Sequence, residues 1–150
     1  GEAQFVVSGS KDGTIRVWDP VTRGVRGMLE LPHRVALGSV NSLLVVGDTV
    51  ISGGQNKGAG PMHVWNLSNL CYETALVGHT DAVMCLAAHG EHFLSGSWDR
   101  SVREWGLAGR TCLRVFEDGV SAPVLNIVTC GGCFVTCGTS GCAQVWQLDG

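Results

Sequence analysis

Four cysteines near the end of the chain have a spacing that is suited to chemistry. They are Cys130, Cys133, Cys137 and Cys142, in the pattern C-x2-C-x3-C-x4-C. A C-x2-C turn can present two thiolates to one metal ion, so this pattern would suit zinc or an iron–sulfur cluster. The chain has seven cysteines among 150 residues, and an odd number leaves at least one outside any set of disulfides. We therefore expect mostly reduced, buried thiols and a cytoplasmic or nuclear protein.

A histidine, a serine and an aspartate form a second group with chemical potential. His79, Ser95 and Asp99 are the residue types of a general base, a nucleophile and the acid that orients the base in hydrolases. The same types can also form a buried hydrogen-bonded chain that only stabilises a fold. The elements that position these residues decide between the two roles.

The tryptophans reveal a repeat. Trp18, Trp65, Trp105 and Trp146 lie 47, 40 and 41 residues apart. A hydroxyl residue precedes each of them, and the four are Ser8, Ser52, Ser95 and Thr136. The separation is ten residues in three repeats and thirteen in the second, where residues 53–60 predict a longer loop. Two markers that recur together at one period of this length indicate a repeat architecture.

Short alternating segments surround these tryptophans. Residues 14–18 and 101–105 alternate apolar and polar side chains, as half-buried strands do. Glycine and aspartate turn signals, such as residues 11–13 and 89–91, separate such segments. No long stretch has the 3.6-residue period of a helix. The sequence therefore predicts an all-β chain.

Two segments carry a recognisable signature. Residues 8–19 read SGSKDGTIRVWD, and residues 78–105 begin with Gly-His, continue through SGSWD and end on Trp105. Both resemble the WD-repeat family almost throughout, and the similarity extends over nearly the whole chain. The resemblance implies a β-propeller of four-stranded antiparallel blades, with about 3.5–4 blades in a single domain over residues 1–150. The expected blades span residues 5–30, 40–77, 82–116 and 123–147.

The family letters the four strands of a blade a to d outward from the central channel, which implies a strand map. Strands are expected at 5–9, 14–18 and 25–30 (b to d); at 40–46, 49–52, 62–66 and 71–77 (a to d); at 82–88, 92–96, 101–105 and 111–116 (a to d); and at 123–129, 133–137 and 142–147 (a to c).

The resemblance also assigns the polar residues to a structural network. In the third repeat this network would join His79, Ser95, Asp99 and Trp105, and in the first repeat Ser8, Asp12 and Trp18 would take part. The carboxylate accepts from the imidazole, the imidazole meets the hydroxyl, and the hydroxyl accepts from the indole. Each bond would add about 0.5–1.5 kcal/mol. We therefore expect no catalytic residue, no enzymatic activity and no cofactor.

The repeat frame also bears on the cysteines. It places Cys130 and Cys133 at an a–b turn, where the third repeat has His89 and His92. Cys133 and Cys137 would share one strand face but lie two pleats apart, which is far for one ion. We expect packing to be their main role, with a metal-binding module as the alternative.

Function in such a scaffold resides in its loops, so we expect protein or peptide partners at the rim of b–c turns. Trp98 is the main candidate because exposed tryptophan is enriched at binding hot spots. Packing of Trp98 over the neighbouring blade is the alternative. Further candidates are Lys11, Thr139, Arg16, Arg100 and Arg103, although solvated strand-face arginines are the simpler interpretation. A purely structural element of a larger assembly is a second possible function.

The remaining expectations concern partners and context. The net charge is −3 and no basic patch is visible, so we expect no nucleic-acid partner. The apolar runs are far shorter than the ~20 residues that span a bilayer, so we expect no membrane insertion. An open ring exposes sheet edges, so we expect the rest of the propeller in the same longer chain, or self-association that closes the ring.

Overall fold

Fourteen strands make up almost all of the described chain. The computed structural model describes residues 5–32 and 37–148, and this part contains no α-helix. The strands are β1 (Val6–Gly9), β2 (Ile15–Trp18), β3 (Val25–Met28), β4 (Ser39–Val46), β5 (Thr49–Gln55), β6 (Met62–Asn66), β7 (Cys71–Leu76), β8 (Val83–His89), β9 (His92–Ser97), β10 (Val102–Gly106), β11 (Cys112–Phe116), β12 (Val124–Cys130), β13 (Cys133–Gly138) and β14 (Ala143–Gln147).

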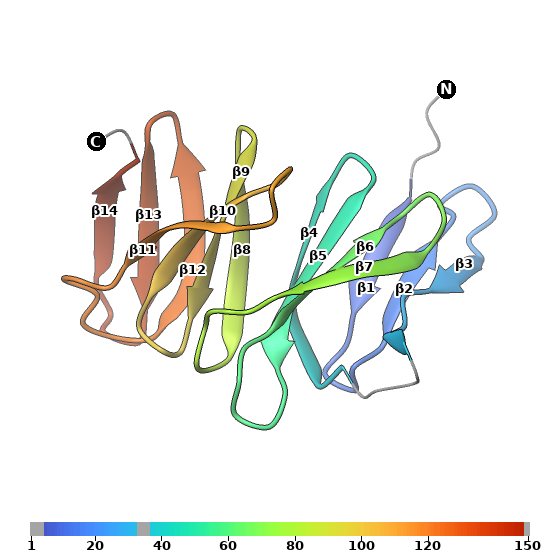
Figure 1. The fold of residues 1–150 in the computed structure, drawn as a ribbon, viewed down its shortest axis with the longest axis horizontal. Coiled ribbons are helices and arrows are strands. Elements are labelled where there is room, and N and C mark those ends of the chain that lie inside the picture. The colour runs from blue at the N-terminus through green and yellow to red at the C-terminus, as the bar shows by residue number, and fades with distance from the viewer. Residues whose placement is uncertain (1–4, 33–36, 149–150) are drawn as a thin grey trace.

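The strands form four antiparallel sheets, which we call blades 1 to 4 (Figure 1). Blade 1 contains β1 to β3, blade 2 contains β4 to β7, blade 3 contains β8 to β11, and blade 4 contains β12 to β14. Within each blade, neighbours in the sequence are neighbours in the sheet. This meander of similar blades confirms the all-β propeller architecture that the sequence predicts.

The a–b turns have the same conformation in three blades. Gly47, Gly90 and Gly131 each take the first position of a two-residue turn, with φ of 55°, 56° and 57°. A positive φ at that position is favourable for glycine and matches the right-handed twist of the strands. These turns lie at one end of the blades, and the b–c turns lie at the other end of strand b.

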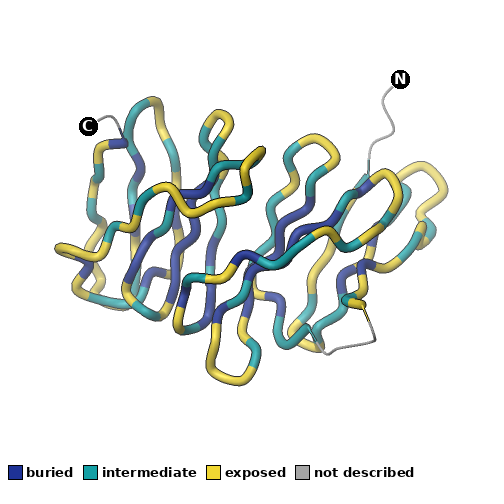
Figure 2. Tube along the Cα trace, viewed as in Figure 1, coloured by how far each residue is buried: buried dark blue, intermediate teal, exposed yellow. Residues whose placement is uncertain are grey.

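Three apolar clusters hold the blades together, one between each pair of neighbours (Figure 2). The cluster between blades 1 and 2 includes Ile15, Val17 and Trp65. Met62 and Trp105 belong to the next cluster, between blades 2 and 3. The third, between blades 3 and 4, includes Leu94 and Phe134 among others. A blade that has another blade on each face is therefore buried on both faces. In β5 of blade 2, every residue from Val50 to Gly54 is buried.

The loop between β5 and β6 in blade 2 is shorter than the loop over residues 53–60 that the sequence predicts. β5 continues to Gln55, because Gly53 and Gly54 still pair with β4 across a bulge. The loop then closes on reciprocal backbone hydrogen bonds between Asn56 and Ala59, both 3.0 Å long. Glycine is suited to both strand positions because other atoms approach the backbone closely there. The other expected strand ends lie within two residues of the observed ones.

Candidate functional site

A chain of four side chains runs through blade 3 from a carboxylate to an indole. His79 Nδ1 lies 2.8 Å from Asp99 Oδ2, and His79 Nε2 lies 2.7 Å from Ser95 Oγ. The indole of Trp105 donates to Ser95 Oγ over 2.8 Å. A neutral imidazole that donates from Nδ1 and accepts at Nε2 satisfies every one of these contacts. The structure therefore brings all four of the predicted network residues of this repeat together.

Asp99 anchors this network in the b–c turn. Its carboxylate also accepts from the backbone N–H of Thr80 and from both the N–H and the hydroxyl of Ser101. Burial alone would raise the pKa of Asp99, but hydrogen bonds from His79, from Ser101 and from the backbone N–H of Thr80 outweigh it. The pKa is therefore held well below its usual range. The role of Ser101 was not predicted. The signal that could have identified it is a hydroxyl residue two positions after the aspartate, which also occurs as Asp-x-Thr in residues 12–14.

The burial of this network bears on the hydrolase interpretation. Ser95 is fully buried and His79 is 5% exposed. The Ser95 hydroxyl already contacts both an imidazole nitrogen and an indole N–H. A nucleophile must reach a substrate carbon, and this oxygen has no free approach in the folded blade. The geometry suits a structural role.

The indole-to-hydroxyl bond recurs in two other blades. Trp18 donates to Ser8 over 2.8 Å, and Trp146 donates to Thr136 over 2.9 Å. Asp12 of blade 1 lies in its b–c turn and accepts from the N–H and hydroxyl of Thr14. The three blades that form the indole bond are those with ten residues between hydroxyl and tryptophan.

Blade 2 is different. Trp65 pairs in the same register, yet its indole nitrogen has no hydrogen-bond partner among the described residues. The ring of His63 lies 5.7 Å from Trp65 and 6.1 Å from Tyr72, measured between ring centroids. His63 is 9% exposed, and neither of its ring nitrogens has a partner within residues 5–32 and 37–148. Burial lowers the pKa of His63, which favours its neutral form.

A second polar cluster joins blades 3 and 4. Glu104 is 3% exposed and accepts from Arg114 over 2.6 Å, and His92 Nδ1 lies 2.8 Å from its other oxygen. Arg114 also donates to the backbone carbonyl of Leu148 in blade 4. Burial would raise the pKa of Glu104, but the hydrogen bonds with Arg114 and His92 lower it. This cluster was not predicted. A charged residue in an alternating strand, such as Glu104, is expected to face solvent when one blade is considered alone.

The b–c turns place the candidate binding residues on one rim of the blades. Trp98 lies in the β9–β10 turn with 45% of its surface exposed. The other candidates in equivalent turns, Lys11 and Thr139, are also exposed. By contrast, Trp65 and Trp105 on strand c are 0% and 2% exposed. Trp98 is thus the tryptophan that the structure leaves most accessible.

The three candidate arginines do not form one group. Arg16 and Arg100 are exposed, whereas Arg103 is partly buried and its Nε has no partner among the described residues. Arg100 follows Asp99 with φ of 64°, where Gly13 and Gly141 stand in the equivalent turns of blades 1 and 4. Positive φ is costly for a residue with a β-carbon. Arg100 is therefore a strained residue on the same rim as Trp98.

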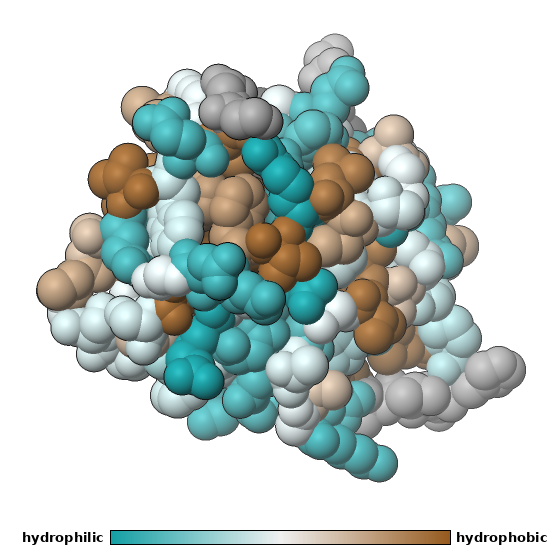
Figure 3. Space-filling model, turned by 60° about the vertical axis from the view of Figure 1, so that its left-hand side comes forward, coloured by the Kyte–Doolittle hydropathy of each residue, from teal (hydrophilic) through white to brown (hydrophobic). Residues whose placement is uncertain are grey.

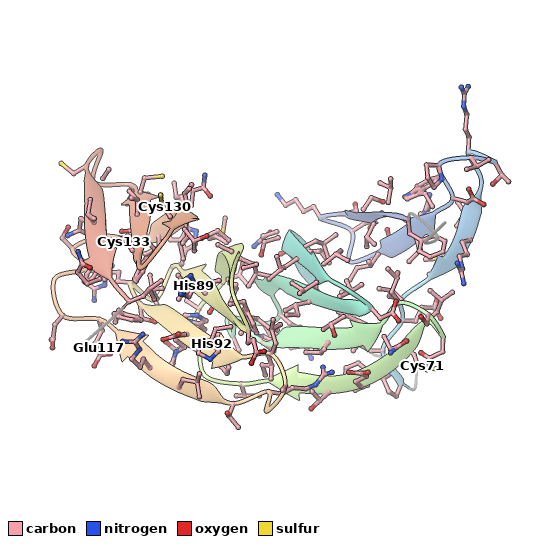
Figure 4. All side chains as sticks on the ribbon, turned by 90° about the horizontal axis from the view of Figure 1, so that it is seen from above. Cys71, His89, His92, Glu117, Cys130 and Cys133 are labelled. Atoms are coloured by element: carbon pink, nitrogen blue, oxygen red, sulfur yellow. The ribbon has the colours of Figure 1, made fainter. Side chains whose placement is uncertain are left out.

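The cysteine cluster is spread along blade 4. Cys130 and Cys133 lie directly opposite each other at the β12–β13 turn, whereas His89 and His92 take the same positions in blade 3 (Figure 4). Cys137 lies four residues further along β13, and all seven cysteines are free. Within the described residues, no group of three or more histidine, cysteine or acidic side chains is placed to hold a metal ion.

The four blades stand side by side in an arc, and the outer faces of blades 1 and 4 at its two ends expose apolar side chains (Figure 1). Val6 in blade 1 is 54% exposed, and Val128 and Val145 in blade 4 are 58% and 71% exposed. Figure 3 turns the blade 4 end forward and shows apolar residues interspersed with polar ones on that side. The described residues contain no helix with the length and apolarity required to cross a membrane.

Comparison with known proteins gives a family match. The family model "WD domain, G-beta repeat" matches residues 2–19 and 70–106. These segments contain Trp18 of blade 1 and all of the blade 3 network residues.

Individual proteins are similar over longer stretches. The human "DDB1- and CUL4-associated factor 13" is 40% identical over 81 residues, which are 51% of this chain and 18% of that protein. "Periodic tryptophan protein 2 homolog" of Caenorhabditis elegans is 31% identical over 100 residues, 67% of this chain and 11% of that protein. The chain thus spans less than a fifth of the length of either relative.

A solved structure resembles the entire described fold. The crystal structure of the computationally designed Ika4 protein superposes with a TM-score of 0.80 and 28% identity. The match covers 96% of this chain and 85% of that one.

Proposed function

The chain belongs to the WD-repeat β-propeller family, and on that basis we propose that it is a non-catalytic scaffold that binds protein or peptide partners. The observation that carries the proposal is the 45% exposed side chain of Trp98 on the b–c rim. Tryptophan leaves water readily and contributes a large contact area, so exposed tryptophan is enriched at binding hot spots. Arg100, two residues from Trp98, has a strained backbone. This also favours the b–c rim as the binding surface, because backbone strain tends to persist where function requires it.

A role without catalysis follows from the burial of the polar network. Ser95 and His79 are enclosed between blades, so we propose that they support the rim and take no part in chemistry. Neither the wild type nor an Asp99→Ala variant should hydrolyse ester or peptide substrates. Hydrolysis by the wild type that disappears in the variant would overturn this part of the proposal.

We propose that the protein acts inside a larger assembly, binds partners other than nucleic acid, and is cytoplasmic or nuclear. One relative is named for its association with DDB1 and CUL4, and a comparable role inside a larger assembly suits a scaffold. The net charge of −3 favours partners other than nucleic acid. A cytoplasmic or nuclear location is supported by the odd number of cysteines.

We also propose that further WD blades of a longer chain cover the two ends of the arc. The exposed valines at both ends support this, because blade faces elsewhere in the fold are buried by their neighbours. Sedimentation of the 150-residue chain tests the proposal. Heterogeneous association would support missing blades, a discrete dimer would instead indicate ring closure by a second copy, and a stable monomer would contradict both.

The binding proposal can be tested with a random peptide library displayed on phage and selected on the purified protein. Affinities of the enriched synthetic peptides are then measured for the wild type and for Trp98→Ala. Loss of the indole should weaken binding at least about tenfold, or 1.4 kcal/mol. Val45→Ala is a matched control, because Val45 is also 45% exposed but lies on β4 near the opposite rim. Its affinity should equal that of the wild type.

Two results would count against the scaffold proposal. If no peptide is enriched, or if Trp98→Ala binds as tightly as the wild type, the rim does not bind peptides through Trp98. A purely structural element of a larger assembly would then be the better description. The thermal unfolding of Trp98→Ala must match that of the wild type, so that reduced binding reports the rim and not the fold.

A further inference from the structure

Cys130 and Cys133 lie opposite each other across the two-residue turn between β12 and β13. Directly opposite residues of an antiparallel pair project to the same face of the sheet. Cys133 alternates with Phe134, which is fully buried against blade 3, so both cysteines belong to the other face of blade 4. Cys130 is exposed and Cys133 is partly exposed. Their counterparts His89 and His92 stay partly exposed although blade 4 packs against blade 3, so a further blade would not enclose this turn. Both thiols are accessible to a reagent in solution.

The spacing across the turn is close to that of a disulfide. Residues that flank a two-residue turn form a hydrogen-bonded pair, whose β-carbons are about 5.5 Å apart. A disulfide requires about 3.5–4.5 Å. The two strands must therefore approach by about 1–2 Å. The turn is well suited to that movement, because both of its residues are glycine. The equivalent turns in blades 2 and 3 contain one glycine each, Gly47 and Gly90.

We propose that Cys130 and Cys133 are a redox-active dithiol that forms a reversible disulfide across the β12–β13 hairpin. The oxidant is a small-molecule disulfide such as oxidised glutathione. A bond that pulls the hairpin together and remains exposed is more easily reduced than a buried structural disulfide. The pair is thus a modification site and not a permanent staple.

The reaction proceeds in two exchange steps. One thiol loses its proton, and its sulfur attacks a sulfur of oxidised glutathione, which forms a mixed disulfide and releases one glutathione thiol. The second cysteine attacks the protein sulfur of that mixed disulfide and releases the second glutathione thiol. The protein loses two protons and two electrons, which together are two hydrogen atoms, and one molecule of oxidised glutathione becomes two of reduced glutathione.

The other cysteines cannot substitute for this pair. Cys137 shares the strand and the face of Cys133, but four residues of strand place it about 13 Å away. Cys142 lies near the opposite end of blade 4, next to the β13–β14 turn. Cys85 is buried between blades 3 and 4, and burial raises its pKa to about 12, so it is a poor nucleophile at neutral pH.

The test uses the folded protein in buffers of reduced and oxidised glutathione, followed by acid quenching, alkylation, mass spectrometry of the intact chain and peptide mapping. We expect a species lighter by two hydrogen atoms, with one linkage between Cys130 and Cys133. Cys137→Ser, the matched control on the same face, should form the linkage equally well. Cys133→Ser should instead accumulate a glutathione adduct on Cys130. Reduced glutathione should reverse each modification.

Three outcomes would overturn the proposal. The first is a wild type in which glutathione adducts on Cys130 persist and no internal linkage forms. The second is a linkage that uses Cys137 or Cys142. The third is a Cys130–Cys133 linkage that appears only in urea concentrations at which circular dichroism shows the fold to be lost. None of these outcomes depends on the peptide-binding proposal, because the β12–β13 turn and the b–c rim lie at opposite ends of the blades.

Discussion

A β-carbon on Gly53 would lie 2.5 Å from Cγ1 of Val83, the valine that blade 3 places over strand b of blade 2. The same relationship joins Gly96 to Val124 of blade 4, where the distance would be 2.6 Å. Gly9 and Val40 repeat it between blades 1 and 2. Side chains in these positions would force neighbouring blades apart. The glycines therefore set the separation of the blades. This role differs from the usual one of glycine, which is to form turns.

Gly53→Ala should destabilise the fold by about 1–3 kcal/mol, because the added methyl group overpacks the interface between blades 2 and 3. Urea unfolding measures the change. Gly24→Ala is a matched control, since its β-carbon would meet only Thr22 Oγ1 at 3.5 Å. That variant should be as stable as the wild type or slightly more stable. Equal stabilities for the two variants would show that the blades can shift apart at no cost.

These contacts explain how much of the fold is predictable from sequence. The tryptophan period and the alternation within strands predict an all-β repeat, because both patterns are local. The order and nearly all the bounds of the strands follow from the resemblance to the WD-repeat family. The end of β5 is not predicted, since Gly53 and Gly54 look like loop residues until the neighbouring strands are placed beside them. Glu104 escapes prediction for the same reason, because its partner Arg114 lies on the neighbouring strand and is held by Leu148, which is distant in sequence.

The blade 3 network predicts an acid-sensitive stability. The pKa of Asp99 is lower in the folded chain than in the unfolded chain, where it is about 3.9. The stabilising contribution of Asp99 is therefore complete well above pH 4 and is lost as the pH falls through the unfolded value toward the folded one. Asp99→Asn should lower the free energy of unfolding at neutral pH by about 1–3 kcal/mol. The difference from the wild type should shrink in acid.

Thermal unfolding of both proteins between neutral and acidic pH tests this expectation. Asp12→Asn is the comparison, because Asp12 lies in the equivalent turn of blade 1 but contacts only turn residues. A difference between wild type and Asp99→Asn that stays constant across the pH range would contradict the assignment of the ionised carboxylate to the network.

The backbone of Arg100 predicts a stabilising substitution. Its φ is 64°, and glycine takes the equivalent position in blades 1 and 4. Arg100→Gly relieves the crowding of the β-carbon but makes the unfolded chain more flexible, so the net gain should be about 0.5–1 kcal/mol. Arg100→Ala removes the same long side chain without relieving the strain and serves as the control. Should the two variants be equally stable, the strain at this position is negligible.

His63 predicts a second pH dependence, which arises from burial and not from a carboxylate. The pKa of His63 is lower in the folded chain than the usual 6.5, so the unfolded chain binds the proton more tightly. Protonation therefore favours unfolding, and the wild type should lose stability as the pH falls below about 6.5. His63→Leu removes the titrating group while preserving an apolar contact with Trp65 and Tyr72. The variant should lose less stability than the wild type over the same pH interval.

The two proteins should be compared by urea unfolding between pH 7 and pH 5, where Asp99 remains ionised in the folded and unfolded chains and cannot mask the effect. His92→Leu is a useful second variant, because His92 is 42% exposed at its side chain and contacts Glu104, so its loss removes an exposed contact with a carboxylate and not a buried imidazole. If His63→Leu and the wild type have parallel stability profiles over this interval, His63 has a hydrogen-bonding partner that keeps its pKa near the usual value. If only His63→Leu has the flatter profile, the buried imidazole beside Trp65 and Tyr72 accounts for the loss of stability below about pH 6.5.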